Sequence, residues 1–186
     1  MIIAKRDDDR IIVAVSIADC SVDMTVSDLV LQDNLPIHKV RGEKDCYICA
    51  KSISLDFDIL RFNDKIFRGI EDGNTVLKKV VPQMKSLLDS YPGFSSGYWC
   101  GTLLIIKGAT MYIIDADFCV SEERDEYCAC NSSIPQGALY ALRNSSLGVT
   151  ERILEAMRCS CLMQDKLFPA VIFDTKTNKR KAVVYK

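Results

Sequence analysis

The sequence is poor in histidine and in the residues that interrupt regular structure. His38 is its single histidine, which excludes a histidine-rich metal centre and allows at most one pairing of a histidine with a serine or cysteine nucleophile. No spacing indicates such a partner, so we expect His38 at the surface. Five Pro and nine Gly are few for 186 residues, of which 48% are hydrophobic and 26% charged. This composition predicts a packed globular chain rather than a disordered one.

The sequence also lacks an excess of one charge and a long hydrophobic run. Its 24 Lys+Arg and 25 Asp+Glu give a net charge of −1, so no basic footprint for nucleic acid or for an anionic membrane is present. No segment approaches the roughly 18 consecutive apolar residues that a membrane-spanning helix requires. We therefore expect a cytoplasmic protein with no nucleic-acid and no membrane partner.

The nine cysteines are an odd number in a chain long enough to fold without disulfides, so we expect reduced thiols. Three closely spaced cysteine pairs together contain enough thiols for a four-ligand zinc site: Cys46/Cys49, Cys128/Cys130 and Cys159/Cys161. Residues three apart on a strand point to opposite faces, and residues two apart on a helix are separated by roughly 200°. Buried small side chains explain the cysteines better than a cysteine-rich zinc module, and we expect no metal and no cofactor.

The spacing of the apolar residues is typical first of strands, then of two helices, then of strands, of two more helices and again of strands. Strands are predicted at 2–6, 10–18, 39–40, 46–50, 101–106, 111–114, 127–130, 168–173 and 181–185, with a charged loop at 121–126. Stripes at three- and four-residue intervals predict helices at 54–70, 76–88, 135–143 and 150–163, with a bend at Pro82. The order predicts an α+β fold, a four-layer αββα sandwich in one domain spanning 1–186.

One segment carries a family resemblance in addition to the element order. A predicted strand leads through Asn131-Ser132-Ser133 into an alanine-containing helix with Pro135 near its start and Tyr140 inside it. This segment and the layout of most of the chain resemble the proteasome β subunits and HslV-type peptidases of the N-terminal-nucleophile hydrolases. In that family the corresponding turn is Gly-Ser-Gly.

The resemblance implies three catalytic positions. Asp19 follows the second strand where the family has an Asp in a turn, Lys39 precedes Val40 where a Lys-Val pair opens the next strand, and Ser132 lies in the Gly-Ser-Gly place. In the family these side chains tune an N-terminal threonine, whose hydroxyl attacks an amide carbonyl while its α-amine acts as the base. Other roles stay open: a solvated Lys39, a turn cap at Asp19 and a helix N-cap at Ser132.

The sequence departs from the family where the chemistry takes place. Met1 replaces the N-terminal nucleophile, and the bulky Ile2 is expected to prevent its removal. Ala50-Lys51-Ser52 stands in place of a glycine-rich substrate turn that contributes to the oxyanion hole. Cys161-Leu162-Met163 stands where a second Asp is expected, with Asp165 out of step.

The resemblance and the departures together imply a proteasome-like protein that is catalytically silent or altered. We expect it to act in an oligomeric assembly, as a homo-oligomer, with an ATPase or another protein as a further partner. The alternative is an active amide hydrolase, a peptidase or amidase whose nucleophile is exposed by processing or supplied elsewhere; Cys20 and Ser16 are poor candidates because they lie beyond the first strand.

Overall fold

The computed structural model describes residues 2–16, 36–50, 55–91, 101–129, 134–162 and 169–184. The chain divides into two compact units. Unit 1 comprises Met1–Asp33 and Asp125–Lys186, and unit 2 comprises Asn34–Arg124. Unit 2 is thus an insertion between two halves of unit 1.

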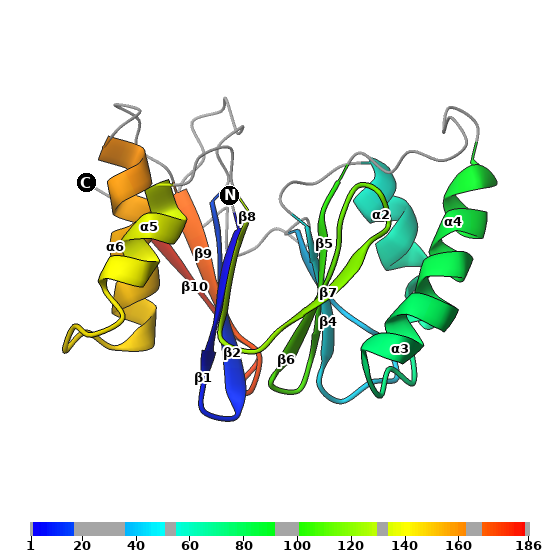
Figure 1. Cartoon of the computed structure of the whole chain (residues 1–186), viewed down its shortest axis with the longest axis horizontal. Coiled ribbons are helices and arrows are strands. Elements are labelled where there is room, and N and C mark those ends of the chain that lie inside the picture. Colours follow the sequence, from blue (N-terminus) through cyan, green and yellow to red (C-terminus); the bar gives the residue numbers. More distant parts are fainter. Residues whose placement is uncertain are drawn as a thin grey trace. The chain divides into compact units, whose positions relative to one another are not determined.

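Unit 1 is built on a five-stranded antiparallel sheet (Figure 1). Its strands in spatial order are β10 (Lys179–Val184), β9 (Pro169–Asp174), β2 (Arg10–Ser16), β1 (Ile2–Asp7) and β8 (Glu126–Ala129). The predicted N-terminal hairpin is confirmed: β1 pairs with β2 from Ile2↔Val15 to Asp7↔Arg10. Asp8 in its turn has a φ of 55°, a left-handed conformation that Asp tolerates better than most residues.

Two helices cover one face of this sheet, α5 (Ile134–Ala141) and α6 (Val149–Leu162) (Figure 1). Both lie close to the predicted ranges. The sheet alternates inward and outward side chains, and the set on the helical side packs against α5 and α6. This core consists of Ile3, Ile12, Ala14, Leu139, Ile153, Ala156, Met157, Ala170 and Ile172.

Unit 2 is built on a second five-stranded antiparallel sheet. Its strands in spatial order are β3 (Ile37–Lys39), β4 (Cys46–Ala50), β5 (Leu103–Lys107), β6 (Thr110–Ile114) and β7 (Val120–Glu123). Short turns join β3 to β4, β5 to β6 and β6 to β7, whereas the helices of the unit lie between β4 and β5 in the chain. In the turn between β3 and β4, Gly42 has a φ of 83°, which favours glycine because a side chain is strained there.

The helical layer of unit 2 is more broken than the sequence predicts. The expected helix at 54–70 is α2 (Leu55–Phe62) followed by the 3₁₀ turn η1 (Asp64–Phe67), and the next helix runs through α3 (Gly73–Thr75), the π-helical turn η2 (Val76–Val80) and α4 (Val81–Asp89). Pro82 has no N–H to donate and its ring would crowd the preceding turn. The helix adapts through the wider turn, in which the Val81 N–H donates to the Val76 carbonyl.

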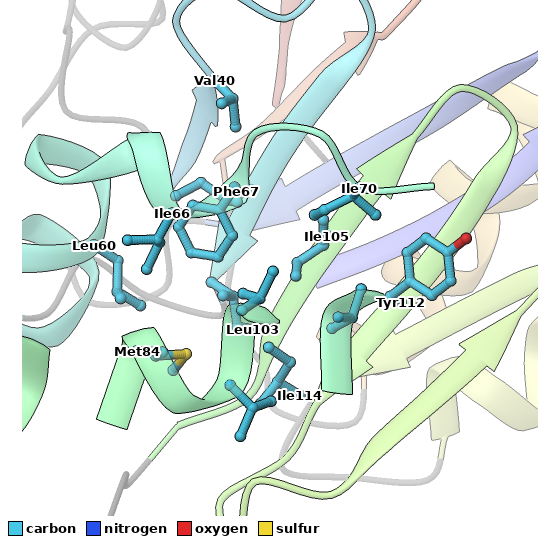
Figure 2. Packing of buried hydrophobic residues seen from close by; sticks show 14 of the residues in the cluster. Val40, Leu60, Ile66, Phe67, Ile70, Met84, Leu103, Ile105, Tyr112 and Ile114 are labelled. Atoms are coloured by element: carbon cyan, nitrogen blue, oxygen red, sulfur yellow. The ribbon is translucent and has the colours of Figure 1, made fainter. Parts of the chain in front are cut away.

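The core of unit 2 lies between these helices and one face of its sheet. Figure 2 shows Leu60, Ile66 and Phe67 from the α2–η1 segment and Met84 of α4 gathered beside Leu103, Ile105 and Ile114 of the sheet. Phe57, Leu60, Phe67 and Met84 are each 0% exposed. Burying side chains of this size contributes about 1.5 to 3 kcal/mol each to folding, so these contacts fix the helices on the sheet.

The predicted charged loop at 121–126 is wrong in part, because β7 occupies Val120–Glu123. β7 is polar and half-buried to exposed, so it carries no apolar alternation to identify it; its pairing with β6, from Met111↔Glu123 to Ile114↔Val120, defines it. The preceding turn contains Phe118 with a φ of 63°, a conformation that is unusual for a bulky residue. Its ring is buried, with the Lys85 ammonium 4.6 Å from the ring centroid, and this packing holds the turn.

Two of the described thiols lie as the strand geometry predicts, whereas Cys159 is half-buried and Cys119 is exposed. Cys46 and Cys49 are both buried in β4, and only Cys46 belongs to the helix-facing core. Within the described ranges, no group of three or more His, Cys, Asp or Glu side chains is placed to hold a metal ion. None of the described helices combines the length and the apolar character needed to cross a membrane.

We predict that Phe67→Ala lowers the free energy of unfolding by about 3 to 5 kcal/mol, because it removes a buried ring and leaves a cavity. Urea denaturation followed by circular dichroism measures the change. The matched control is Leu77→Ala in the same helical layer, where the side chain is 50% exposed; we expect less than about 0.5 kcal/mol. Equal losses for the two variants would contradict the core described for unit 2.

Candidate functional site

Most positions that the resemblance singled out lie outside the described residues. Met1, Asp19 and Ser132 are among these, as are Cys20 and the Lys51-Ser52 part of the substrate-turn segment. Ala50 ends β4, and Cys161 and Leu162 lie at the end of α6. The predicted grouping of Asp19, Lys39 and Ser132 therefore stays a prediction.

Lys39 is the one predicted catalytic residue that the structure describes. It is the last residue of β3 and lies opposite Tyr47 of β4. Its side chain is exposed, and its ammonium lies 5.7 Å from the centroid of the buried Tyr47 ring. Such a cation–π contact at an exposed site is worth about 0.5 to 1 kcal/mol. Lys39 is thus an exposed lysine whose ammonium lies over a ring, and its catalytic role stays a prediction.

The neighbouring His38 takes part in a buried polar cluster that the sequence did not predict. Its Nε2 lies 2.8 Å from Oδ2 of Asp64, a carboxylate that is 1% exposed. The same oxygen accepts hydrogen bonds from the backbone N–H of Arg41 at 2.9 Å and from its Nε at 3.0 Å. The expectation of a surface histidine holds in part: the His38 side chain is 25% exposed, and Asp64 holds its ring.

The electrostatics of the cluster keep Asp64 ionised. Burial alone raises the pKa of a carboxyl group because it disfavours the charged form. The hydrogen bonds from Arg41 and His38 outweigh burial, and the pKa of Asp64 lies below its ordinary value. Arg41 also donates from Nη2 to the Phe62 carbonyl at 3.0 Å, so the cluster ties the β3–β4 hairpin to the end of α2 and to η1.

A carboxylate and the imidazole that it orients are two of the three members of a nucleophilic triad. Cys46, a thiol in the core of the same unit, does not supply the third member. Cys46 lies in the core with its Sγ 3.8 Å from the Phe67 carbonyl, and burial raises its pKa to about 12. Because the thiolate is the reactive form, Cys46 is inert at neutral pH. In the described residues, the contacts of the His38–Asp64–Arg41 cluster join secondary-structure elements.

Unit 1 contains a comparable cluster around a buried lysine. Lys5 of β1 is 5% exposed, and its ammonium lies 3.0 Å from Oε2 of Glu126 and 3.1 Å from Oδ1 of Asp125. Arg143, just beyond α5, reaches Oε1 of Glu126 at 2.8 Å. Lys5 and Glu126 are cross-strand partners in the β1–β8 pair. The network thus joins β1, β8 and the end of α5.

Sequence reasoning missed both clusters for the same reason. Lys5 and Glu126 are 121 residues apart, and His38 and Asp64 are 26 residues apart. No short motif links such positions. A weak signal does exist for Lys5, since it continues the apolar run of the first strand and alternation places it on the same face as Ile3, which packs in the core.

We predict that Asp64→Asn destabilises the protein by about 2 to 3 kcal/mol at neutral pH, because charge-assisted hydrogen bonds to a buried carboxylate are lost. The folded-state pKa of Asp64 is lowered, so its contribution is present above the unfolded pKa of about 4 and is lost as the pH falls through the folded value. The stability difference between wild type and variant should therefore shrink below about pH 4.

Urea denaturation at a series of pH values tests whether the stability difference between wild type and Asp64→Asn shrinks as the pH falls. Asp115→Asn removes an exposed carboxylate of the same unit and serves as the control, with an expected change below about 0.5 kcal/mol. A difference for Asp64→Asn that grows as the pH falls would show that the carboxylate is not held ionised by the cluster.

No protein-family model and no curated protein sequence matches the chain. Solved structures do match over its whole length. Two are structures of Thiobacillus denitrificans BPH, a bacterial proteasome homologue. The structure in complex with epoxomicin has a TM-score of 0.60 and 16% sequence identity and covers 100% of this chain and 97% of that chain. The other has a TM-score of 0.55, 14% identity and the same coverage. The chain therefore has a proteasome-like fold.

Proposed function

We propose that the chain is a proteasome-like protein that works as a subunit of an oligomeric assembly and is catalytically silent or altered. The observation that carries the proposal is the fold likeness to Thiobacillus denitrificans BPH, because it extends over the whole of this chain and nearly all of that one. A likeness at 16% identity supports a shared architecture and leaves the chemistry to the residues of this chain. A cytoplasmic location is part of the proposal.

The proposal includes a four-layer αββα arrangement. Each sheet has a second face, away from its helices, whose apolar side chains are buried. In unit 1 these are Ile2, Ala4, Ile11, Val13, Val15, Val171 and Phe173, and in unit 2 they are Tyr47, Cys49, Leu104, Ile106, Met111 and Ile113. A sheet with two apolar faces requires a layer on each. The four-layer arrangement that the sequence predicts would meet this requirement.

The composition of β1 supports catalytic silence. An N-terminal-nucleophile mechanism needs a hydroxyl or thiol at the start of the first strand. β1 has the sequence IIAKRD, and its first residues Ile2, Ile3 and Ala4 are at most 1% exposed and apolar. The exposed position of Lys39 points the same way, because a solvated ammonium is a weak electrostatic aid to a nucleophile. The described part of the first strand thus contains no hydroxyl or thiol side chain.

The alternative function is an active amide hydrolase. One observation favours it: the matched BPH structure is a complex with epoxomicin, so this fold accommodates such a ligand in that protein. An active form of this chain would need a nucleophile exposed by processing or supplied from elsewhere.

We predict that epoxomicin and a peptide vinyl sulfone leave this protein unmodified, because neither electrophile meets an activated nucleophile. Intact-mass spectrometry after incubation should give the mass of the untreated protein, about 20.9 kDa for the full sequence. Thiobacillus denitrificans BPH is the positive control for epoxomicin. A stoichiometric adduct, or turnover of fluorogenic peptides that Lys39→Ala abolishes, would favour the active hydrolase and give Lys39 a catalytic role.

We also predict a homo-oligomer in solution. Light scattering coupled to size exclusion at micromolar concentration should report a multiple of 20.9 kDa. Most soluble oligomers consist of identical copies related by closed symmetry, so the assembly has a fixed number of copies. A mass near that of one chain at every accessible concentration would contradict this part of the proposal. An ATPase partner stays a proposal that affinity measurements with purified candidates can address.

A further inference from the structure

The sheets of the two units end in edge strands of opposite charge. β10 is the last strand of the unit 1 sheet and begins with the exposed Lys179, Arg180 and Lys181. β7 is the last strand of the unit 2 sheet and carries the exposed Glu122 and Glu123. Within the described residues no further strand pairs with either, so each edge presents main-chain N–H and C=O groups to a strand from outside its sheet.

The hydrogen bonds of β9 determine which residues of β10 face outward. The Thr175 N–H donates to the Ile11 carbonyl at 3.1 Å, so residue 175 points its main-chain groups toward β2. Because these directions alternate along a strand, Asp174 points toward β10 and its partner Lys179 points back toward β9. The outward positions of β10 are Arg180, Ala182 and Val184.

The same alternation determines the outward residues of β7. The Asp115 N–H donates to the Cys119 carbonyl at 3.0 Å, one step beyond the Ile114↔Val120 pair that β6 makes with β7. Residues 119, 121 and 123 therefore point their main-chain groups toward β6. The outward positions of β7 are Val120 and Glu122.

The two edges match in both hydrogen bonding and charge. If β10 lies antiparallel to β7 with Arg180 opposite Glu122, two outward residues face each other and can exchange both main-chain hydrogen bonds. This register also places Lys179 opposite Glu123, and opposite charges directly across antiparallel strands stabilise their pairing. Glu122 also pairs with Arg124 of its own strand end at 2.8 Å, an exposed ion pair that contributes little.

Each edge is unfavourable for its own copy. Two β10 strands side by side would bring lysine and arginine side chains together, and two β7 strands would bring glutamates together. Like charges on an edge strand are one way in which proteins prevent such self-pairing. The charges therefore favour contact between the two different edges.

The chain cannot make this pairing with itself. Glu126 of β8 and Lys179 of β10 stand in one row across the five strands of the unit 1 sheet. Four strand spacings separate them, about 19 Å in all. Glu123 precedes Glu126 by three residues, which span about 11 Å at most. Glu123 therefore does not reach the position opposite Lys179 of its own chain, and the partner is a second copy.

We propose that β10 of one copy pairs antiparallel with β7 of a second copy, with Arg180 opposite Glu122. The inference deepens the homo-oligomer of the proposed function and rests on it, because it names the contact between the copies. The two edges are different surfaces, so the contact is head-to-tail. Its repetition closes into a ring or extends into a filament.

Sedimentation velocity over a concentration series tests the charges. Arg180→Glu and Glu122→Lys should each weaken association about threefold or more, because each places like charges opposite one another in the contact. The double variant restores an opposite pair and should recover most of the loss. Lys78→Glu is the control, since it makes the same charge change as Arg180→Glu at an exposed residue away from both edges and should associate like wild type.

The outcomes separate this contact from the proposed function. Circular dichroism checks that each variant is folded. Folded single variants that associate like wild type, or a double variant without recovery, overturn the β10–β7 contact while the homo-oligomer itself persists. A wild type that stays monomeric at every accessible concentration contradicts both.

A proline tests whether the main chains pair. Ala182→Pro removes an N–H that points away from β9, and an edge strand tolerates proline at such a position. We expect the variant to keep its stability to urea and to lose association about fivefold or more, because a hydrogen bond across the contact is lost. Ala182→Ser keeps the N–H and should associate like wild type. Wild-type association of the folded proline variant would overturn the strand pairing.

Discussion

The structure of each unit depends on one constraint: a sheet of alternating side chains must bury its apolar face beneath helices. In unit 1 the face that includes Ile3 and Ala14 lies under α5 and α6, and in unit 2 the face that includes Ile105 and Ile114 lies under α2 and α4. The hairpins fix which residues of neighbouring strands pair. This register decides which side chains form the face that the helices cover. The wider helical turn before Pro82 shows the priority of this packing, since the backbone adapts there while Val76 and Val80 stay buried.

Each unit adds a buried charge at a place where the chain must be held together. Asp64 ties a hairpin turn to the helical layer of unit 2, and Lys5 ties the first strand to β8 and to the residues beyond α5. A buried charge without partners is costly, so these groups stabilise the arrangement that supplies their partners and disfavour others. In the part of the chain that the structure describes, the contacts of both groups link secondary-structure elements.

The proposed function follows from a contrast between architecture and chemistry. The fold is that of a proteasome-like protein over its full length, whereas the described start of the first strand is apolar and buried. A fold that has lost or altered its reactive group can still present surfaces for assembly.

The sequence by itself determined the strands, the helices and their order, because periods of 2 and 3.6 are written locally in residues such as those of β1–β2 and α6. The element order also indicated a proteasome-like fold, with which the matched structures agree. Only the tertiary structure decided the partners of Lys5, His38 and Asp64, and the existence of the polar strand β7, because each depends on pairing between distant segments. It also decided that Lys39 is solvated, since exposure is a property of the packed chain rather than of neighbouring residues.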